Sequence, residues 1–122
     1  MVVVSVSRAI PISLHAAIET IAAPAVMAAP FLLGFSEPAA VVAFAFGAML
    51  LGLAVQSIGP SRAIPLSAHA DFDYVLAALV AVAGLAVGIA TGAWGQAIFL
   101  VGVGVAQVAL TASTRFSAPF GA

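Results

Sequence analysis

Apolar residues fill four long stretches of the chain, and most of the few polar residues lie between them. The stretches run from about Ala16 to Phe35, Ala39 to Ile58, Tyr74 to Ala90 and Ala93 to Ala112. Each is close to the roughly 20 residues that a helix needs to cross the hydrocarbon core of a bilayer. The runs are continuous rather than alternating, and an open sheet cannot satisfy its backbone in lipid, so helices are predicted.

Short connections divide these helices into two pairs. The segments Gly34 to Pro38 and Ala90 to Gly92 are tight, which favours an antiparallel hairpin on each side of the chain's midpoint. Between the pairs, Gly59, Pro60 and Pro65 prevent a continuous helix. The sequence therefore predicts an all-α integral membrane protein of four helices, built from two tandem transmembrane helical hairpins.

A repeated polar phrase marks the start of each hairpin. Residues 7–19 have the sequence SRAIPISLHAAIE, and 54 residues later 61–73 have the sequence SRAIPLSAHADFD. A repeat of two crossings preserves orientation, so a pseudo-twofold axis along the membrane normal is expected. The predicted repeats are 1–59, with helices at about 14–35 and 38–58, and 60–122, with helices at about 68–90 and 93–112.

Composition supports the membrane class and excludes several others. Hydrophobic residues make up 65% of the 122 residues, only seven residues are charged, and the mean hydropathy is +1.30. A soluble domain usually has about a quarter charged residues. The net charge of −1 argues against a nucleic-acid partner, and the lack of cysteine removes disulfides and thiolate metal sites. The expected surroundings are a lipid bilayer.

The arginines predict an orientation in the membrane. All three lie on the side shared by the N-terminus, the central link and the C-terminus. The short turns contain no positive residue and one acid, Glu37. By the positive-inside rule, both termini are expected in the cytoplasm. Interfacial aromatic residues are expected near the helix ends. The predicted membrane-interface residues are Arg8, Arg62, Arg115, Tyr74 and Trp94.

Several single polar or small residues are predicted to shape helix ends and contacts. Ser13 and Ser67 are placed as N-caps of helices that begin one residue later. Gly34 is expected to close the first helix in the left-handed conformation. Gln96 and Gln107 lie roughly on one face of the fourth helix and are expected to make inter-helix hydrogen bonds.

The repeated phrase contains two pairs of a histidine and an acid. His15 and Glu19 are four residues apart, as are His69 and Asp73, so each pair lies on one helix face at about 6 Å. Asp71 lies off that face. Because the pairs occupy equal places in the repeats, they are expected to face each other near the cytoplasmic end of the bundle.

Four interpretations of these pairs remain open. His15, Glu19, His69 and Asp73 form a reasonable ligand set for a divalent metal such as zinc or iron. His15 and His69 alone are possible axial ligands of a haem inside a four-helix bundle. Ionisable groups at membrane depth also suggest a proton or substrate path. The plainest interpretation is structural, with each histidine bonded to the acid four residues later.

A segment before the first turn resembles a known family. Ala29-Pro30-Phe31-Leu32-Leu33-Gly34-Phe35-Ser36 is similar to the signature of the SPW-repeat family of small bacterial membrane proteins, with Ala29 in place of serine and Phe31 in place of tryptophan. In the second copy, only Gly88 matches Gly34. The resemblance implies two copies of a two-helix unit in a bacterial inner membrane. It implies no activity.

The function expected from the sequence is structural. Small residues recur every four positions at Gly84, Gly88 and Gly92, which favours close helix packing within the chain or against another subunit. We expect a non-enzymatic accessory subunit that packs on a larger membrane complex or self-associates. The alternatives are a haem- or metal-binding membrane protein that uses His15 and His69, and a small transporter or channel-like oligomer.

Overall fold

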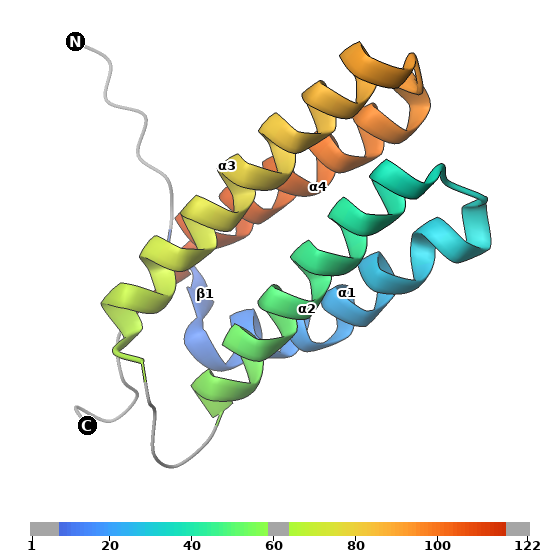
Figure 1. The fold of residues 1–122 in the computed structure, drawn as a ribbon. Helices are drawn as coiled ribbons and strands as arrows, with labels where there is room; N and C mark the ends of the chain where they lie inside the picture. Colours follow the sequence, from blue (N-terminus) through green and yellow to red (C-terminus); the bar gives the residue numbers. More distant parts are fainter. Residues whose placement is uncertain (1–7, 59–63, 117–122) are drawn as a thin grey trace, which may run out of the picture.

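The structure, a computed structural model, describes residues 8–58 and 64–116 and confirms the four-helix, all-α class. Each helix is long and apolar enough to cross a membrane. Consecutive helices run in opposite directions, which gives two hairpins side by side (Figure 1). The elements in chain order are β1 (Ile10–Pro11), α1 (Ile12–Leu33), α2 (Glu37–Ile58), α3 (Leu66–Thr91), α4 (Trp94–Ala112) and β2 (Thr114–Arg115).

The first helix of each hairpin begins directly after a proline. Pro11 and Pro65 are the N-cap residues, with extended backbones at ψ 156° and 150°. The predicted serine caps are therefore wrong, because Ser13 and Ser67 lie inside the first turn and neither helix has a side-chain cap hydrogen bond among the described residues. The fixed φ of proline suits the helix entry, and the helix starts as soon as the extended segment ends.

Glycines end the first helix of each hairpin. Gly34 and Gly92 have φ values of 68° and 73°, the left-handed region that glycine adopts without a steric penalty. The prediction for Gly34 is confirmed. The first turn is also held to the other hairpin, because Gln96 Oε1 accepts hydrogen bonds from the Ser36 backbone N–H at 3.0 Å and from its hydroxyl at 2.8 Å.

Small residues allow the helices of each hairpin to pack closely. A Cβ atom at Gly47 would lie 2.8 Å from the carbonyl oxygen of Ala23 on α1. A Cβ atom at Gly84 would lie 2.8 Å from Leu100 Cβ on α4. These glycines therefore pack within the chain. At Gly52, by contrast, a Cβ atom would meet nothing within 4 Å in the described part of the chain.

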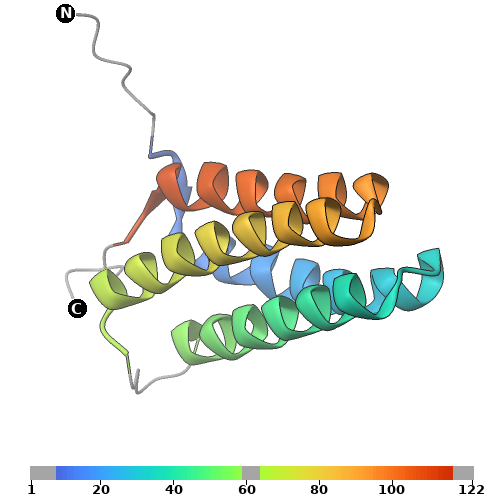
Figure 2. The same ribbon diagram turned by 45° about the horizontal axis from the view of Figure 1, so that its top comes forward.

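Apolar side chains both fill the bundle and cover it. The two views show the helices of each hairpin lying side by side along their length (Figure 1 and Figure 2). The most exposed large apolar side chains of the described residues are Leu32 (83%), Ile89 (76%), Ile21 (75%) and Phe31 (71%). Tyr74 and Trp94 are 41% and 49% exposed. An apolar outer surface of this kind is stable in lipid rather than in water, so this is a small multi-pass membrane protein.

The two ends of the described chain meet at one end of the bundle. β1 and β2 form a short parallel pair in which Ile10 lies opposite Thr114, and the Ile10 N–H donates to the Ser113 carbonyl at 3.0 Å. Arg8, two residues before β1, and Arg115, in β2, are both exposed. The third predicted interface arginine, Arg62, lies outside the described residues.

Candidate metal centre

Polar side chains occupy the bundle core at the end where β1 and β2 pair. His15 and Glu19 are the fourth and eighth residues of α1, and His69 and Asp73 hold the same places in α3. At a rise of about 1.5 Å per residue, both pairs therefore lie roughly 5–10 Å inside the helix ends. All four side chains are at most 2% exposed. We call these four residues the His/acid cluster.

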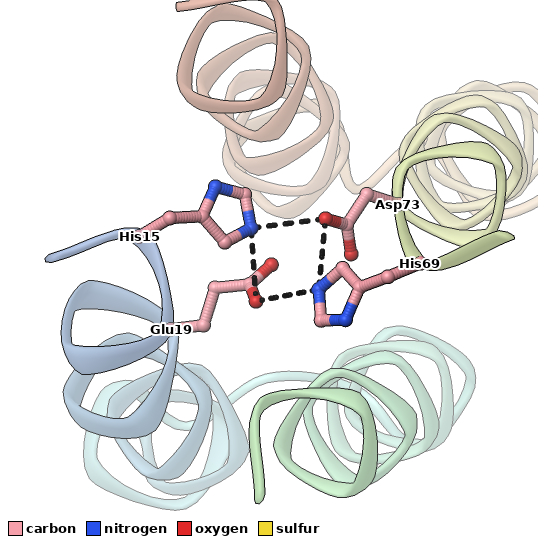
Figure 3. A group of neighbouring side chains, drawn as sticks. All are labelled: His15, Glu19, His69 and Asp73. Carbon is pink, nitrogen blue, oxygen red and sulfur yellow. Dashed lines mark hydrogen bonds and ion pairs between the residues drawn. The ribbon is translucent and has the colours of Figure 1, made fainter. Parts of the chain in front are cut away.

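The four side chains meet in a closed ring of nitrogen and oxygen atoms. His15 Nε2 lies 3.1 Å from Glu19 Oε1 and 3.0 Å from Asp73 Oδ2. His69 Nε2 lies 3.3 Å from Glu19 Oε1 and 3.2 Å from Asp73 Oδ2. Figure 3 shows this ring between α1 and α3, with nitrogen and oxygen alternating at its corners. One oxygen of each carboxylate, Glu19 Oε1 and Asp73 Oδ2, thus touches both imidazoles.

The hydrogen bonds of the ring run between hairpins. His15 Nε2 has hydrogen-bond geometry to Asp73, and His69 Nε2 has it to Glu19. Within each helix, histidine and acid are close but show no such geometry in the described residues. The structural interpretation, in which each histidine bonds the acid on its own helix, therefore misses the main link, which joins α1 to α3.

Gln107 of α4 holds one oxygen of Glu19. Its Nε2 donates to Glu19 Oε2 at 2.8 Å and lies 3.4 Å from Thr111 Oγ1, which is also buried. The amide nitrogen thus donates to both Glu19 and Thr111, which fixes its position. The expected inter-helix hydrogen bond of Gln107 is present, and its partner is the carboxylate of the cluster.

Thr114 of β2 determines which nitrogen of His15 carries a hydrogen. The Thr114 hydroxyl donates to the Leu110 carbonyl at 2.6 Å, which uses its only hydrogen. Thr114 Oγ1 therefore accepts from His15 Nδ1–H at 2.8 Å. In a neutral His15, Nε2 is then a bare lone pair that faces two carboxylate oxygens. This arrangement is repulsive unless Nε2 is protonated or a cation lies between the three atoms.

Phe116 covers the cluster on the side of β2. Its ring centroid lies 5.1 Å from that of His15 and 5.8 Å from that of His69. The two imidazoles are themselves edge to face, with centroids 5.5 Å apart. An aromatic cover lowers the local dielectric constant, which strengthens every charge interaction beneath it.

One oxygen of the cluster has no hydrogen-bond partner among the described residues. Asp73 Oδ1 is buried and unpaired, whereas Oδ2 of the same group touches both imidazoles. Buried polar atoms in native proteins are almost always paired, so an unpaired one requires an explanation. The other acid of the phrase, Asp71, is exposed, as expected from its helix face.

The ring has the dimensions of a metal site. All four donor atoms lie within 4.8 Å of one another. Adjacent donor atoms lie 3.0–3.3 Å apart and the widest separation is within 4.8 Å, so the centre of the ring lies at most about 2.4 Å from a donor on the longest diagonal. A small inward movement of the side chains would reach the roughly 2.0–2.2 Å at which zinc binds nitrogen and oxygen. Imidazole and carboxylate together suit Zn²⁺, Fe²⁺, Mn²⁺ and their neighbours.

The sequence predicts the four cluster residues but not their surroundings. The spacing of four and the repeat identify both pairs, and the structure brings the pairs together. The roles of Thr114 and Phe116 were missed because these residues follow the last helix and contact His15 only through the fold. One signal for this segment is present in the sequence, because Ser113-Thr114-Arg115 resembles the Ser-Arg that begins both copies of the phrase.

No model of a known protein family, no curated protein and no solved structure matches this chain. The resemblance to SPW-repeat proteins stays a prediction. The case for function therefore depends on the geometry of the cluster.

Proposed function

We propose that this protein is a membrane subunit that binds one divalent transition-metal ion at the His/acid cluster and uses it to join its two hairpins. The observation that supports this most strongly is the closed ring of four buried donor atoms at 3.0–3.3 Å. Two donors come from α1 and two from α3, so an ion at the centre binds both hairpins at once.

Charge supports a divalent ion. With neutral imidazoles the cluster carries two negative charges, and uncompensated charge at membrane depth is costly. A divalent cation neutralises both carboxylates. It also accepts the His15 Nε2 lone pair, whose tautomer Thr114 fixes. Metal-bound histidines commonly donate their second N–H to an oxygen in this way.

A haem is disfavoured by the same geometry. Axial ligation by His15 and His69 would place the porphyrin plane between the two imidazoles. Glu19 Oε1 and Asp73 Oδ2 already occupy that plane, each within 3.3 Å of both Nε2 atoms. The absorption of a haem is therefore not expected in the purified protein.

A path for protons or ions through a single chain is also disfavoured. Away from the cluster, the bundle core is formed by apolar side chains that pack together. Its members include Phe46, Leu50, Val80, Val87 and Leu100. The buried polar side chains of the described core are therefore concentrated at one end of the bundle. This arrangement suits a site that holds an ion rather than a path that carries it across the membrane.

A joining role fits how the hairpins pack. Close glycine contacts hold α1 to α2 and α3 to α4, and the hairpins meet mainly through α2 and α3. The cluster adds a link between α1 and α3, which lie across the bundle from each other in Figure 3. We infer a structural, non-enzymatic site, because its four ligand side chains are buried and engaged with one another. An accessory role beside larger membrane subunits is consistent with this.

Metal analysis tests the proposal. Protein purified from its native membrane with a tag that contains no histidine should contain about one transition-metal ion per chain. His15→Ala and His69→Ala should each abolish this content, whereas Gln96→Leu, at the far end of the bundle, should retain it. Metal-free native protein that also fails to take up Zn²⁺, Fe²⁺ or Mn²⁺ would refute the proposal.

A further inference from the structure

The two carboxylates of the cluster have unequal surroundings. Glu19 offers Oε1 to the ring, and its other oxygen accepts a hydrogen bond from Gln107 at 2.8 Å. Asp73 offers Oδ2, but Oδ1 is buried without a hydrogen-bond partner among the described residues. In Figure 3, this second oxygen lies inside the ring of helices and carries no dashed line.

The repeat explains the difference. Gln107 has Leu53 as its counterpart 54 residues earlier, and leucine has no hydrogen-bond donor. Leu53 is buried in the apolar core with Leu76. The amide that satisfies Glu19 therefore has no equivalent for Asp73, although the two acids hold the same place in their helices.

We propose that Asp73 binds the metal ion through both oxygens and Glu19 through only one, so that the ion has five ligand atoms. This inference rests on the proposed function, because it concerns the same site. The five atoms are the two Nε2 atoms of His15 and His69, Oε1 of Glu19 and both carboxylate oxygens of Asp73.

The unpaired oxygen can reach the ion by a local movement. Rotation about the terminal χ2 torsion of an aspartate is soft, so Oδ1 can turn toward the ion without a backbone shift. Binding then removes the cost of a buried, unpaired acceptor. Glu19 gains nothing from the same rotation, because it would lose its hydrogen bond from Gln107.

Gln107 acts in this scheme as a positioning residue. Its amide keeps Glu19 monodentate, and its contact with Thr111 keeps the amide in place. Five-coordinate geometry with two nitrogens and three oxygens favours ions that accept more than four ligands, such as Fe²⁺, Mn²⁺ and Co²⁺, over a strictly tetrahedral zinc site.

Cobalt substitution tests the coordination number. The full chain in detergent is loaded with one equivalent of Co²⁺, and the visible d–d absorption and X-ray absorption edge are recorded. Four-coordinate cobalt absorbs strongly, five-coordinate cobalt several-fold less, and six-coordinate cobalt least. The native chain should give the five-coordinate spectrum.

Two glutamine variants provide the comparison. Gln107→Leu releases Glu19 Oε2 to the ion and should weaken the absorption toward the six-coordinate value. Gln96→Leu makes the same change on the same helix, 11 residues away, and should leave the native spectrum. Asp73→Asn should strengthen the absorption toward the four-coordinate value, because a neutral amide does not bind through two atoms.

The outcomes separate the two proposals. A four-coordinate spectrum in the native chain would overturn the bidentate role of Asp73 while leaving the metal site intact. An unchanged spectrum in Gln107→Leu would overturn the role of Gln107. No cobalt binding by any of these proteins would instead refute the metal site itself.

Discussion

The contact between Thr114 and His15 provides a sharp test of how the fold prepares the metal site. Thr114→Val keeps the shape of the side chain but removes the oxygen that accepts from His15 Nδ1–H at 2.8 Å. The imidazole then loses the partner that fixes its tautomer and leaves a buried donor unpaired. Thr114 is not one of the four proposed ligands, so the substitution affects the site without changing any ligand.

The expected loss can be estimated in two ways. Removing the partner of a metal-bound histidine typically lowers affinity about 10–100-fold, which corresponds to about 1.4–2.8 kcal/mol. Leaving a buried donor unpaired costs about 1–3 kcal/mol. The two ranges agree, so the Kd for Zn²⁺ is expected to rise 10–100-fold in Thr114→Val.

Competition with a chromophoric zinc chelator in detergent measures this Kd. Thr20→Val is the matched control, because the Thr20 hydroxyl also donates to a carbonyl four residues earlier at 2.6 Å but has no contact with a histidine in the described residues. Thr114→Ser should keep the native Kd. If Thr114→Val binds Zn²⁺ as tightly as the native chain, the argument from the His15 tautomer is wrong.

Three further predictions concern the bundle and its orientation. In thermal unfolding, Gly84→Ala should destabilise the protein by about 1–3 kcal/mol, because the new Cβ would lie 2.8 Å from Leu100 Cβ. Gly52→Ala should be neutral in the same experiment, because its Cβ would meet nothing within 4 Å in the described residues. Equal effects of the two substitutions would contradict the packing described. Gln96→Leu should lower the free energy of unfolding by about 1 kcal/mol, because the hydrogen bonds to Ser36 are lost. An unchanged midpoint of thermal unfolding would show that these hydrogen bonds do not stabilise the protein. Reporter fusions should place both termini in the cytoplasm, and termini on opposite sides would exclude the four-span topology.

Much of the fold could be predicted because hydrophobic length and turn residues are local signals. The four helices, the two turns and the left-handed Gly34 all follow from short stretches of sequence. The helix starts were predicted two residues too late because serine was favoured as the cap. Pro11 and Pro65 are themselves the cap residues.

The candidate site could be predicted only in part, for a physical reason. Spacing along a helix places His15 with Glu19 and His69 with Asp73, but the hydrogen bonds follow the contact between hairpins, which no local pattern specifies. The sequence predicts that Gln107 makes an inter-helix hydrogen bond, but it does not predict that Glu19 is the partner. The contribution of Thr114 depends on β2 folding back beside β1, a contact between positions more than 100 residues apart.

The central claim is that both histidines bind one ion, and electron paramagnetic resonance of bound Cu²⁺ tests it most directly. The chain has only two histidines, so an untagged protein gives an unambiguous count of imidazole nitrogens. With one equivalent of Cu²⁺, the native chain should show hyperfine coupling to two imidazole nitrogens, and His15→Gln and His69→Gln should each show one. A native spectrum with one coupled nitrogen, or with none, would contradict a shared metal site.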